Sequence, residues 1–130
     1  MYQESIAFCG WVGELLGQIS AKAAAKDQLD RASTSLPLNI AEGNGKFSNV
    51  DRARFLEIAR GSALECAACL DVLAVRKLIT GKQILPAKER LIRIVNMLMG
   101  MLKRFSGRAE FLREGEGLYA IDQEHEKEQE

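Results

Sequence analysis

The sequence has a single histidine, His125, which lies close to the C-terminus of the 130-residue chain. This scarcity excludes the Ser–His and Cys–His pairs that activate a nucleophile. It also excludes the Glu-x-x-His motifs that hold di-iron centres in helical bundles. A zinc site around Cys66 and Cys69 would have only Cys9 and His125 as further ligands. We therefore predict a protein that is not an enzyme and has no cofactor or metal.

Proline, aromatic residues and long apolar runs are also rare. Two prolines and 6% aromatic residues, set against 47% hydrophobic residues, favour an all-α protein. No apolar run approaches the ~20 residues that span a bilayer. Residues 1–5 lack the basic start of a signal peptide. We expect a cytoplasmic protein that makes no membrane contact.

The formal net charge of zero hides an uneven distribution of charge. Residues 1–113 carry 17 Lys and Arg against 11 Asp and Glu, a balance of +6. Residues 114–130 carry one Lys against seven Asp and Glu, a balance of −6. We predict one folded domain over residues 1–113 and a flexible acidic tail over residues 114–130. The basic residues 1–113 are suited to binding a polyanion. The acidic residues 114–130 are suited to competing with that polyanion for the same basic surface.

The helical spacing of apolar residues predicts four helices. The first spans about residues 4–25, the second 27–42 and the third 48–77. The fourth has Pro86 in its first turn, where a missing N–H costs nothing. Short connections between consecutive helices predict an antiparallel, up-and-down four-helix bundle.

The second helix contains Pro37, which removes one backbone hydrogen bond and clashes with the carbonyl four residues earlier. We therefore expect a kink, or two short helices that meet near Ser35. Asp27 suits the N-cap of this helix. Gly43 suits the left-handed residue that follows a helix end.

The third helix is the longest, and Ser48 with Asp51 three residues later predicts its N-cap. It carries apolar residues along two stripes, so it lies at the centre of the bundle or is shared with another subunit. The first stripe is Ala53, Leu56, Ala63, Ala67, Leu70 and Ala74, and the second is Phe55, Ala59, Ser62, Cys66, Cys69 and Leu73.

Two short motifs suggest chemistry but are better explained by structure. Cys66 and Cys69 form a Cys-x-x-Cys pair, yet they lie deep inside a helix and not at its start, so we predict core packing. Residues 43–46, Gly-Asn-Gly-Lys, are too short for a phosphate loop and follow no strand. We predict that they form a turn that ends the second helix.

Glu42 and Glu65 each lie within a mostly small or apolar stretch. A buried carboxylate has to be paired or hydrogen-bonded. We therefore predict that both are structural and fix the register of one helix against another. The candidate partners are Arg31, Arg52 and Arg60.

The fourth helix is the most basic segment of the chain. Together with three cations near the second turn, it predicts a surface that binds phosphate backbone without reading base sequence. An ordinary solvated charged surface explains the same residues. They are Lys46, Arg52, Arg54, Lys88, Arg90, Arg93, Lys103, Arg104 and Arg108.

Two longer motifs resemble a known bacterial family. They are residues 36–43, Leu-Pro-Leu-Asn-Ile-Ala-Glu-Gly, with Gly45-Lys46 after them, and residues 55–65. Both are similar to motifs of the four-helix-bundle proteins encoded in 23S rRNA intervening sequences. The matching residues are Pro37, Asn39, Glu42, Gly43, Gly45, Gly61, Ser62 and Glu65.

This resemblance implies an up-and-down four-helix bundle that forms a ring-shaped homo-oligomer, with a pentamer as the expected state. It implies no established enzymatic activity. A related branch, the accessory proteins of diversity-generating retroelements, is basic and binds nucleic acid and a reverse transcriptase. The acidic tail of residues 114–130 departs from that pattern.

The prediction for function is therefore a non-enzymatic, homo-oligomeric bundle that acts as a binding scaffold, with RNA or DNA as a candidate ligand of its basic surface. The alternative is a protein–protein interaction module with no role in nucleic-acid binding.

Overall fold

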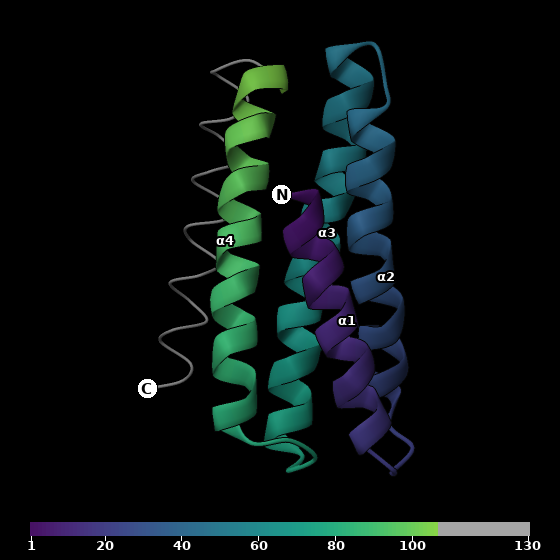
Figure 1. Ribbon diagram of the computed structural model, residues 1–130, viewed down its shortest axis with the longest axis vertical. Coiled ribbons are helices and arrows are strands. Elements are labelled where there is room, and N and C mark those ends of the chain that lie inside the picture. Colours follow the sequence, from purple (N-terminus) through teal and green to yellow (C-terminus); the bar gives the residue numbers. More distant parts are fainter. Residues whose placement is uncertain (107–130) are drawn as a thin grey trace.

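The computed structural model describes residues 1–106 and contains four α-helices, with no strand in that part of the chain. They are α1 (Tyr2–Gln18), α2 (Ala24–Asn44), α3 (Asn49–Val75) and α4 (Gly81–Ser106). Consecutive helices run in opposite directions along one long axis (Figure 1). The predicted all-α, up-and-down four-helix bundle is confirmed. Arg108 and the acidic tail of residues 114–130 lie outside the described residues.

Helix α3 is central to the packing. It makes its main contacts with α2 and α4, whereas α1 packs chiefly on α2 and only slightly on α4. Both predicted stripes of α3 contribute buried residues, with Leu56 and Leu70 from one and Cys66 and Leu73 from the other, all fully buried. The two-stripe pattern therefore indicated a helix that packs against neighbours on two sides.

Helix α1 is much shorter than the prediction, because it ends at Gln18 and not near residue 25. The backbone turns extended at Ile19, whose carbonyl accepts a hydrogen bond from Lys26 Nζ at 2.6 Å. Helix α2 then begins at Ala24, so Asp27 lies in its first turn and the prediction of an Asp27 N-cap is wrong. Asp27 still has a favourable place there, since a carboxylate near a helix N-terminus interacts well with the helix dipole.

Helix α2 runs through Pro37 without a break, so the alternative of two short helices meeting near Ser35 is wrong. Pro37 is buried. Because proline has no N–H, the carbonyl of Ser33 loses the donor it would have in an ordinary helix. Surrounding packing stabilises the helix at this point despite that loss.

Gly43 lies inside α2 and not beyond its end, so the prediction of a left-handed terminating residue is wrong. Its physical role is close packing of two helices. A Cβ at this position would lie 3.2 Å from the Leu56 side chain and 3.3 Å from the carbonyl oxygen of Arg52, both on α3. The C-cap of α2 is Gly45, with an ordinary right-handed conformation.

The two remaining helix starts are capped by side chains. The Asp51 N–H donates to Ser48 Oγ at 3.1 Å, which confirms the predicted N-cap of α3. Helix α4 begins at Gly81, before the predicted start near Pro86, because Thr80 and Gln83 form a capping box. The Gln83 N–H donates to Thr80 Oγ1 at 3.2 Å, and the Thr80 N–H donates to Gln83 Oε1 at 2.8 Å.

Candidate functional surfaces

A polar contact joins α2 and α3 near the middle of the bundle. The Ser35 and Ser62 hydroxyls lie 2.9 Å apart. Asn39 Nδ2 donates to Ser35 Oγ at 2.9 Å and to the Ser35 carbonyl at 2.8 Å. Ser62 is buried, whereas Ser35 and Asn39 are half-buried. This network fixes the register of α2 against α3 by side-chain hydrogen bonds, two residues away from Pro37 on either side.

Glu42 and Glu65 do not form the buried, register-fixing carboxylates that we predicted, because both are exposed. Glu42 pairs with Lys46 at 3.6 Å, and the Glu42 side chain is 59% exposed. The better-shielded ion pair in α3 joins Arg60 to Glu57 at 2.6 Å. Arg60 is thus the partner of Glu57, and the register of α2 and α3 rests on hydroxyl groups where we expected carboxylates.

The other motif residues divide between packing and surface positions. Pro37, Gly43 and Ser62 are buried between helices, whereas Gly45 and Gly61 are exposed. Among residues 1–106, no atom would lie within 4 Å of a Cβ placed at Gly61, as is also the case for the three glycines of α1. Glycine in the middle of a helix costs up to ~1 kcal/mol relative to alanine. Nothing within residues 1–106 therefore requires glycine at position 61.

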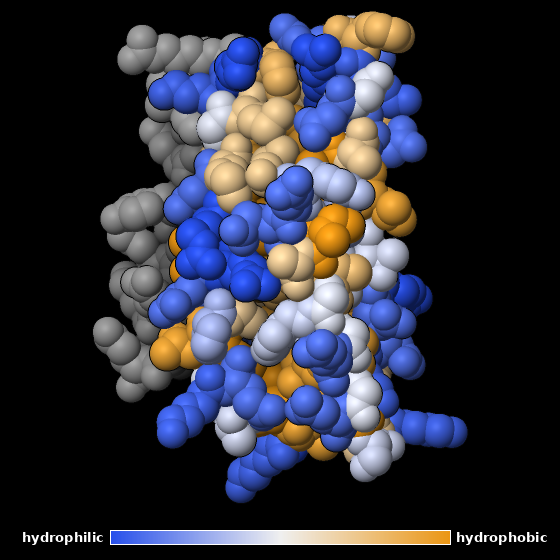
Figure 2. Space-filling view, in the orientation of Figure 1, coloured by the Kyte–Doolittle hydropathy of each residue, from blue (hydrophilic) through white to orange (hydrophobic). Residues whose placement is uncertain are grey.

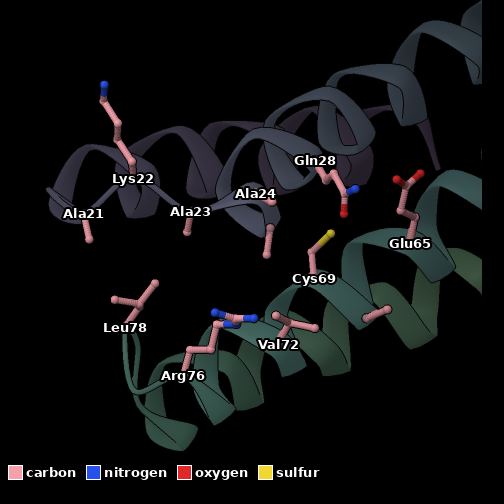
Figure 3. Close-up of a pocket in the computed structure, with 12 residues that line it drawn as sticks. Ala21, Lys22, Ala23, Ala24, Gln28, Glu65, Cys69, Val72, Arg76 and Leu78 are labelled. Carbon is pink, nitrogen blue, oxygen red and sulfur yellow. The ribbon is translucent and has the colours of Figure 1, made fainter.

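A cavity of about 590 Å³ lies at the end of the bundle where α2 starts and α3 finishes. Its lining includes residues 21–25, Gln28, Glu65, Cys69 and Arg76. Figure 3 shows Gln28, Glu65, Cys69 and Arg76 beside the space between the two helices, while Lys22 extends away from it. The titratable groups among the lining residues are thus one carboxylate, one guanidinium, one thiol and the amine of Lys22.

The cysteines of α3 are packing residues, as predicted. Cys66 is fully buried and Cys69 is 4% exposed. Burial, with smaller contributions from Cys69, Glu65 and Cys9, raises the pKa of the Cys66 thiol to about 12. Burial and Glu65 also raise the pKa of Cys69. Because the reactive form is the thiolate, both side chains are poorly suited to nucleophilic or redox chemistry near neutral pH.

Several cations of the predicted basic surface make contacts within the chain. Lys88 forms an ion pair with Asp71 of α3, and Arg90 lies 3.8 Å from Glu4 of α1. Lys46 Nζ lies 5.0 Å from the centre of the Phe55 ring, in addition to its contact with Glu42.

Arg52 is also engaged. Its Nε donates to the Lys46 carbonyl at 2.7 Å, and its guanidinium lies 5.6 Å from the centre of the Phe105 ring. Arg54, Arg93, Lys103 and Arg104 are exposed. The eight predicted residues that lie within residues 1–106 thus occupy several sides of the bundle, and those near the α2–α3 turn and the end of α4 share one end.

Comparison with known proteins identifies the family. The family model described as 23S rRNA-intervening sequence protein matches residues 1–100. The chain belongs to this family. A solved structure from Bacteroides thetaiotaomicron, of a protein of unknown function in the S23 ribosomal protein family, superimposes with a TM-score of 0.75 at 24% sequence identity. The superposition covers 78% of this chain and 97% of the other.

No curated protein sequence matches this member of the 23S rRNA-intervening sequence protein family. At 24% identity the solved structure bears on the fold alone. None of the helices within residues 1–106 combines the length and the hydrophobicity needed to cross a membrane.

Proposed function

We propose that the protein is a non-enzymatic, self-associating helical bundle that acts as a binding scaffold. The observation that carries this proposal is a set of large apolar side chains exposed on the outer side of α3 and α4, named here the α3–α4 patch. It comprises Leu64 (38% exposed), Val75 (81%), Leu85 (60%) and Ile92 (60%).

The patch residues follow helical spacing on both helices. Leu64 and Val75 are separated by eleven residues, or about three turns of α3, and Leu85 and Ile92 by seven residues, or about two turns of α4. The ion pair between Asp71 and Lys88 bridges the two helices. Apolar groups around an ion pair are a common composition for a protein interface, since their burial is favourable and the charged pair adds orientation.

A second copy of the chain is the proposed partner, in a closed ring of five subunits. Closed symmetry is the usual state of homo-oligomers. The open space above Gly61 on α3 also supports this proposal, because a glycine there permits close approach of a neighbouring helix. Light scattering of the full chain at micromolar concentration tests it. We expect a mass of about five times the 14.4 kDa of one chain, and a single-chain mass would contradict self-association.

A surface variant tests which residues form the contact. Ile92→Asp places a charge in the α3–α4 patch and should shift the measured mass towards one chain. Val50→Asp is the matched control, because Val50 is 72% exposed near the opposite end of the bundle. Equal dissociation in both variants, or in neither, would mean that the α3–α4 patch is not the interface.

Binding of nucleic-acid phosphates is the proposed role of the exposed cations Arg54, Arg93 and Arg104. Electrophoretic mobility shift with a generic RNA and a generic duplex DNA tests it. We expect a shift that weakens with salt, and weakens further when these three arginines become glutamine, because each phosphate contact releases counterions. Lys82→Gln, at the far end of α4, is the control.

Failure of this second test has a specific meaning. A lack of any salt-sensitive shift, together with a stable oligomer, would support the alternative of a protein–protein interaction module. That alternative is favoured by the contacts that Lys46, Arg52, Lys88 and Arg90 make within the chain.

A further inference from the structure

Helix α1 covers only part of the bundle's length, and one side of α4 continues beyond it. Arg90 marks where α1 begins, because its Nε lies 3.8 Å from Glu4 in the first turn of α1. Helix α4 runs on from Arg90 to Ser106, about four further turns. In Figure 1 the start of α1 lies near mid-height, and α4 and α2 extend above it.

The residues on this side of α4 are a mixture of methionine and arginine. Arg93, Met97, Met101 and Arg104 follow Arg90 at helical spacing, so they continue the stripe that contacts α1. We name these four residues the open α4 stripe. Met97 is 36% exposed and Met101 is half-buried, whereas both arginines are exposed. Figure 2 shows hydrophobic side chains at the surface between α4 and α2, above the level at which α1 begins.

The surroundings of the stripe are apolar and open. Phe105 is half-buried beside it, with the Arg52 guanidinium 5.6 Å from the ring centre. Among residues 1–106, no atom would lie within 4 Å of a Cβ placed at Gly100. The stripe thus offers apolar contacts with cations at both ends, which suits a segment that combines apolar residues with acidic ones.

The chain contains such a segment. Residues 118–121, Leu-Tyr-Ala-Ile, lie within the acidic residues 114–130, whose charge balance is −6. Eleven residues lie between Ser106 and Leu118, and the twelve Cα–Cα steps that join the two span up to ~40 Å when extended. From Arg104 back to Arg93 along α4 is about 16 Å at 1.5 Å per residue. The tail is therefore long enough to return along the stripe, and its tether gives it a high effective concentration there.

We infer that residues 114–130 bind the open α4 stripe of their own chain. Residues 118–121 contact Met97 and Met101, and the flanking carboxylates pair with Arg93 and Arg104. The tail then occupies two of the exposed arginines proposed above for phosphate binding, so it competes with any polyanion for them. The intramolecular contact itself does not depend on nucleic-acid binding.

Photo-cross-linking of the full chain tests this contact. Tyr119 is replaced by p-benzoylphenylalanine, whose excited ketone inserts preferentially into C–H bonds beside methionine sulfur. Mass spectrometry then locates the linked residue. We expect links to Met97 and Met101. Met99 is the internal control, because it lies 3.4 Å from Arg60 Nη1 of α3 and so faces another helix.

Mixing isotopically heavy and light chains separates the two sources of a link. Links within one isotopic form support the proposal. Links found only between heavy and light chains would overturn it in favour of a second copy, and links spread evenly over all methionines, or none at Met97 and Met101, would overturn it outright.

Charge variants test the ionic part. Arg93→Gln combined with Arg104→Gln should lower the yield of these links by about threefold or more, since two ion pairs are lost. Raising the salt concentration should act in the same direction. Lys82→Gln, an exposed cation in the first turn of α4, is the control and should leave the yield unchanged. An unchanged yield in the double variant would overturn the proposed pairing.

Discussion

The Ser35 hydroxyl of α2 lies 2.9 Å from the Ser62 hydroxyl of α3, and Asn39 donates to the same Ser35 oxygen. This pair is a side-chain hydrogen bond between two consecutive helices, made by residues that are 27 positions apart in the sequence. It lies close to the buried Pro37, where α2 has lost a backbone donor. Side-chain bonding between helices thus stabilises α2 near the point where its own hydrogen-bond ladder is weakened.

A double-mutant cycle measures that contact. Ser62→Ala should lower the free energy of unfolding by about 1 kcal/mol, the usual net value of one hydrogen bond. Ser35→Ala should cost a similar amount, and the double variant less than the sum, because the two residues share one bond. Urea denaturation supplies the free energies. Thr34→Ala, on the exposed side of α2, is the control, and strict additivity would show that the pair is not coupled.

Two glycines predict opposite effects of alanine. Gly43→Ala places a Cβ 3.2 Å from the Leu56 side chain and 3.3 Å from the Arg52 carbonyl oxygen, so these atoms of α3 have to shift by a few tenths of an ångström, and we expect a loss of about 1–3 kcal/mol in the free energy of unfolding. Gly61→Ala meets no atom within 4 Å and should stabilise the isolated chain by about 0.5–1 kcal/mol through helix propensity. Thermal or urea unfolding of both variants tests the contrast. An equal change in the two would contradict it.

Lys77 has a left-handed backbone, with φ of 63°, after the C-cap Arg76. The Leu78 N–H donates to the Leu73 carbonyl at 2.9 Å and the Lys77 N–H to that of Ala74 at 3.0 Å, which is a Schellman motif. Because only glycine adopts this conformation without steric cost, Lys77→Gly should raise the unfolding free energy by about 0.5–1 kcal/mol. Arg76→Gly, at a right-handed position, should lower it.

The buried thiol of Cys66 predicts a loss of stability at high pH. Its pKa is raised from 9.0 to about 12 on folding, so the unfolded chain releases this proton first as the pH rises. The stabilisation is complete below pH 9 and is lost between about pH 9 and pH 12, with a slope of up to about 1.4 kcal/mol per pH unit. Cys66→Ala should show a shallower slope above pH 9 in urea denaturation series. Parallel slopes would contradict the assignment.

The sequence predicted the helices better than it predicted how their polar residues are used. The spacing of apolar residues predicted four helices and indicated that α3 packs at the centre of the bundle. This spacing is informative because a helix that buries one face needs apolar residues at every third or fourth position. The N-cap at Ser48 followed from local chemistry alone. The Thr80–Gln83 capping box is an equally local N-cap pattern and can be recognised in the sequence. We placed the start of α4 near Pro86 because proline is common in the first turn of a helix, and so missed the earlier start at Gly81.

Gly43 and the two glutamates needed tertiary information. A glycine followed by Asn-Gly has the composition of a helix end. Only the approach of Leu56 from α3 explains its place inside α2. Glu42 and Glu65 lie in apolar stretches, yet their positions face outward once the register of α2 and α3 is fixed at Ser35 and Ser62. The residues next to Glu42 and Glu65 in the sequence do not determine this register, because contacts between the two helices set it.

Helix α1 is short and contacts the other helices less than they contact one another, and this difference has a consequence for the order of folding. Helix α3 packs extensively on both of its sequence neighbours, α2 and α4, whereas α1 makes fewer contacts, chiefly with α2, and its Glu4–Arg90 contact joins residues 86 positions apart. Loops between neighbours close at lower entropic cost. Helices α2, α3 and α4 should therefore assemble first, and α1 should dock last and open first. In hydrogen exchange, the amides of α1 would then exchange by a local opening, well before those of α3.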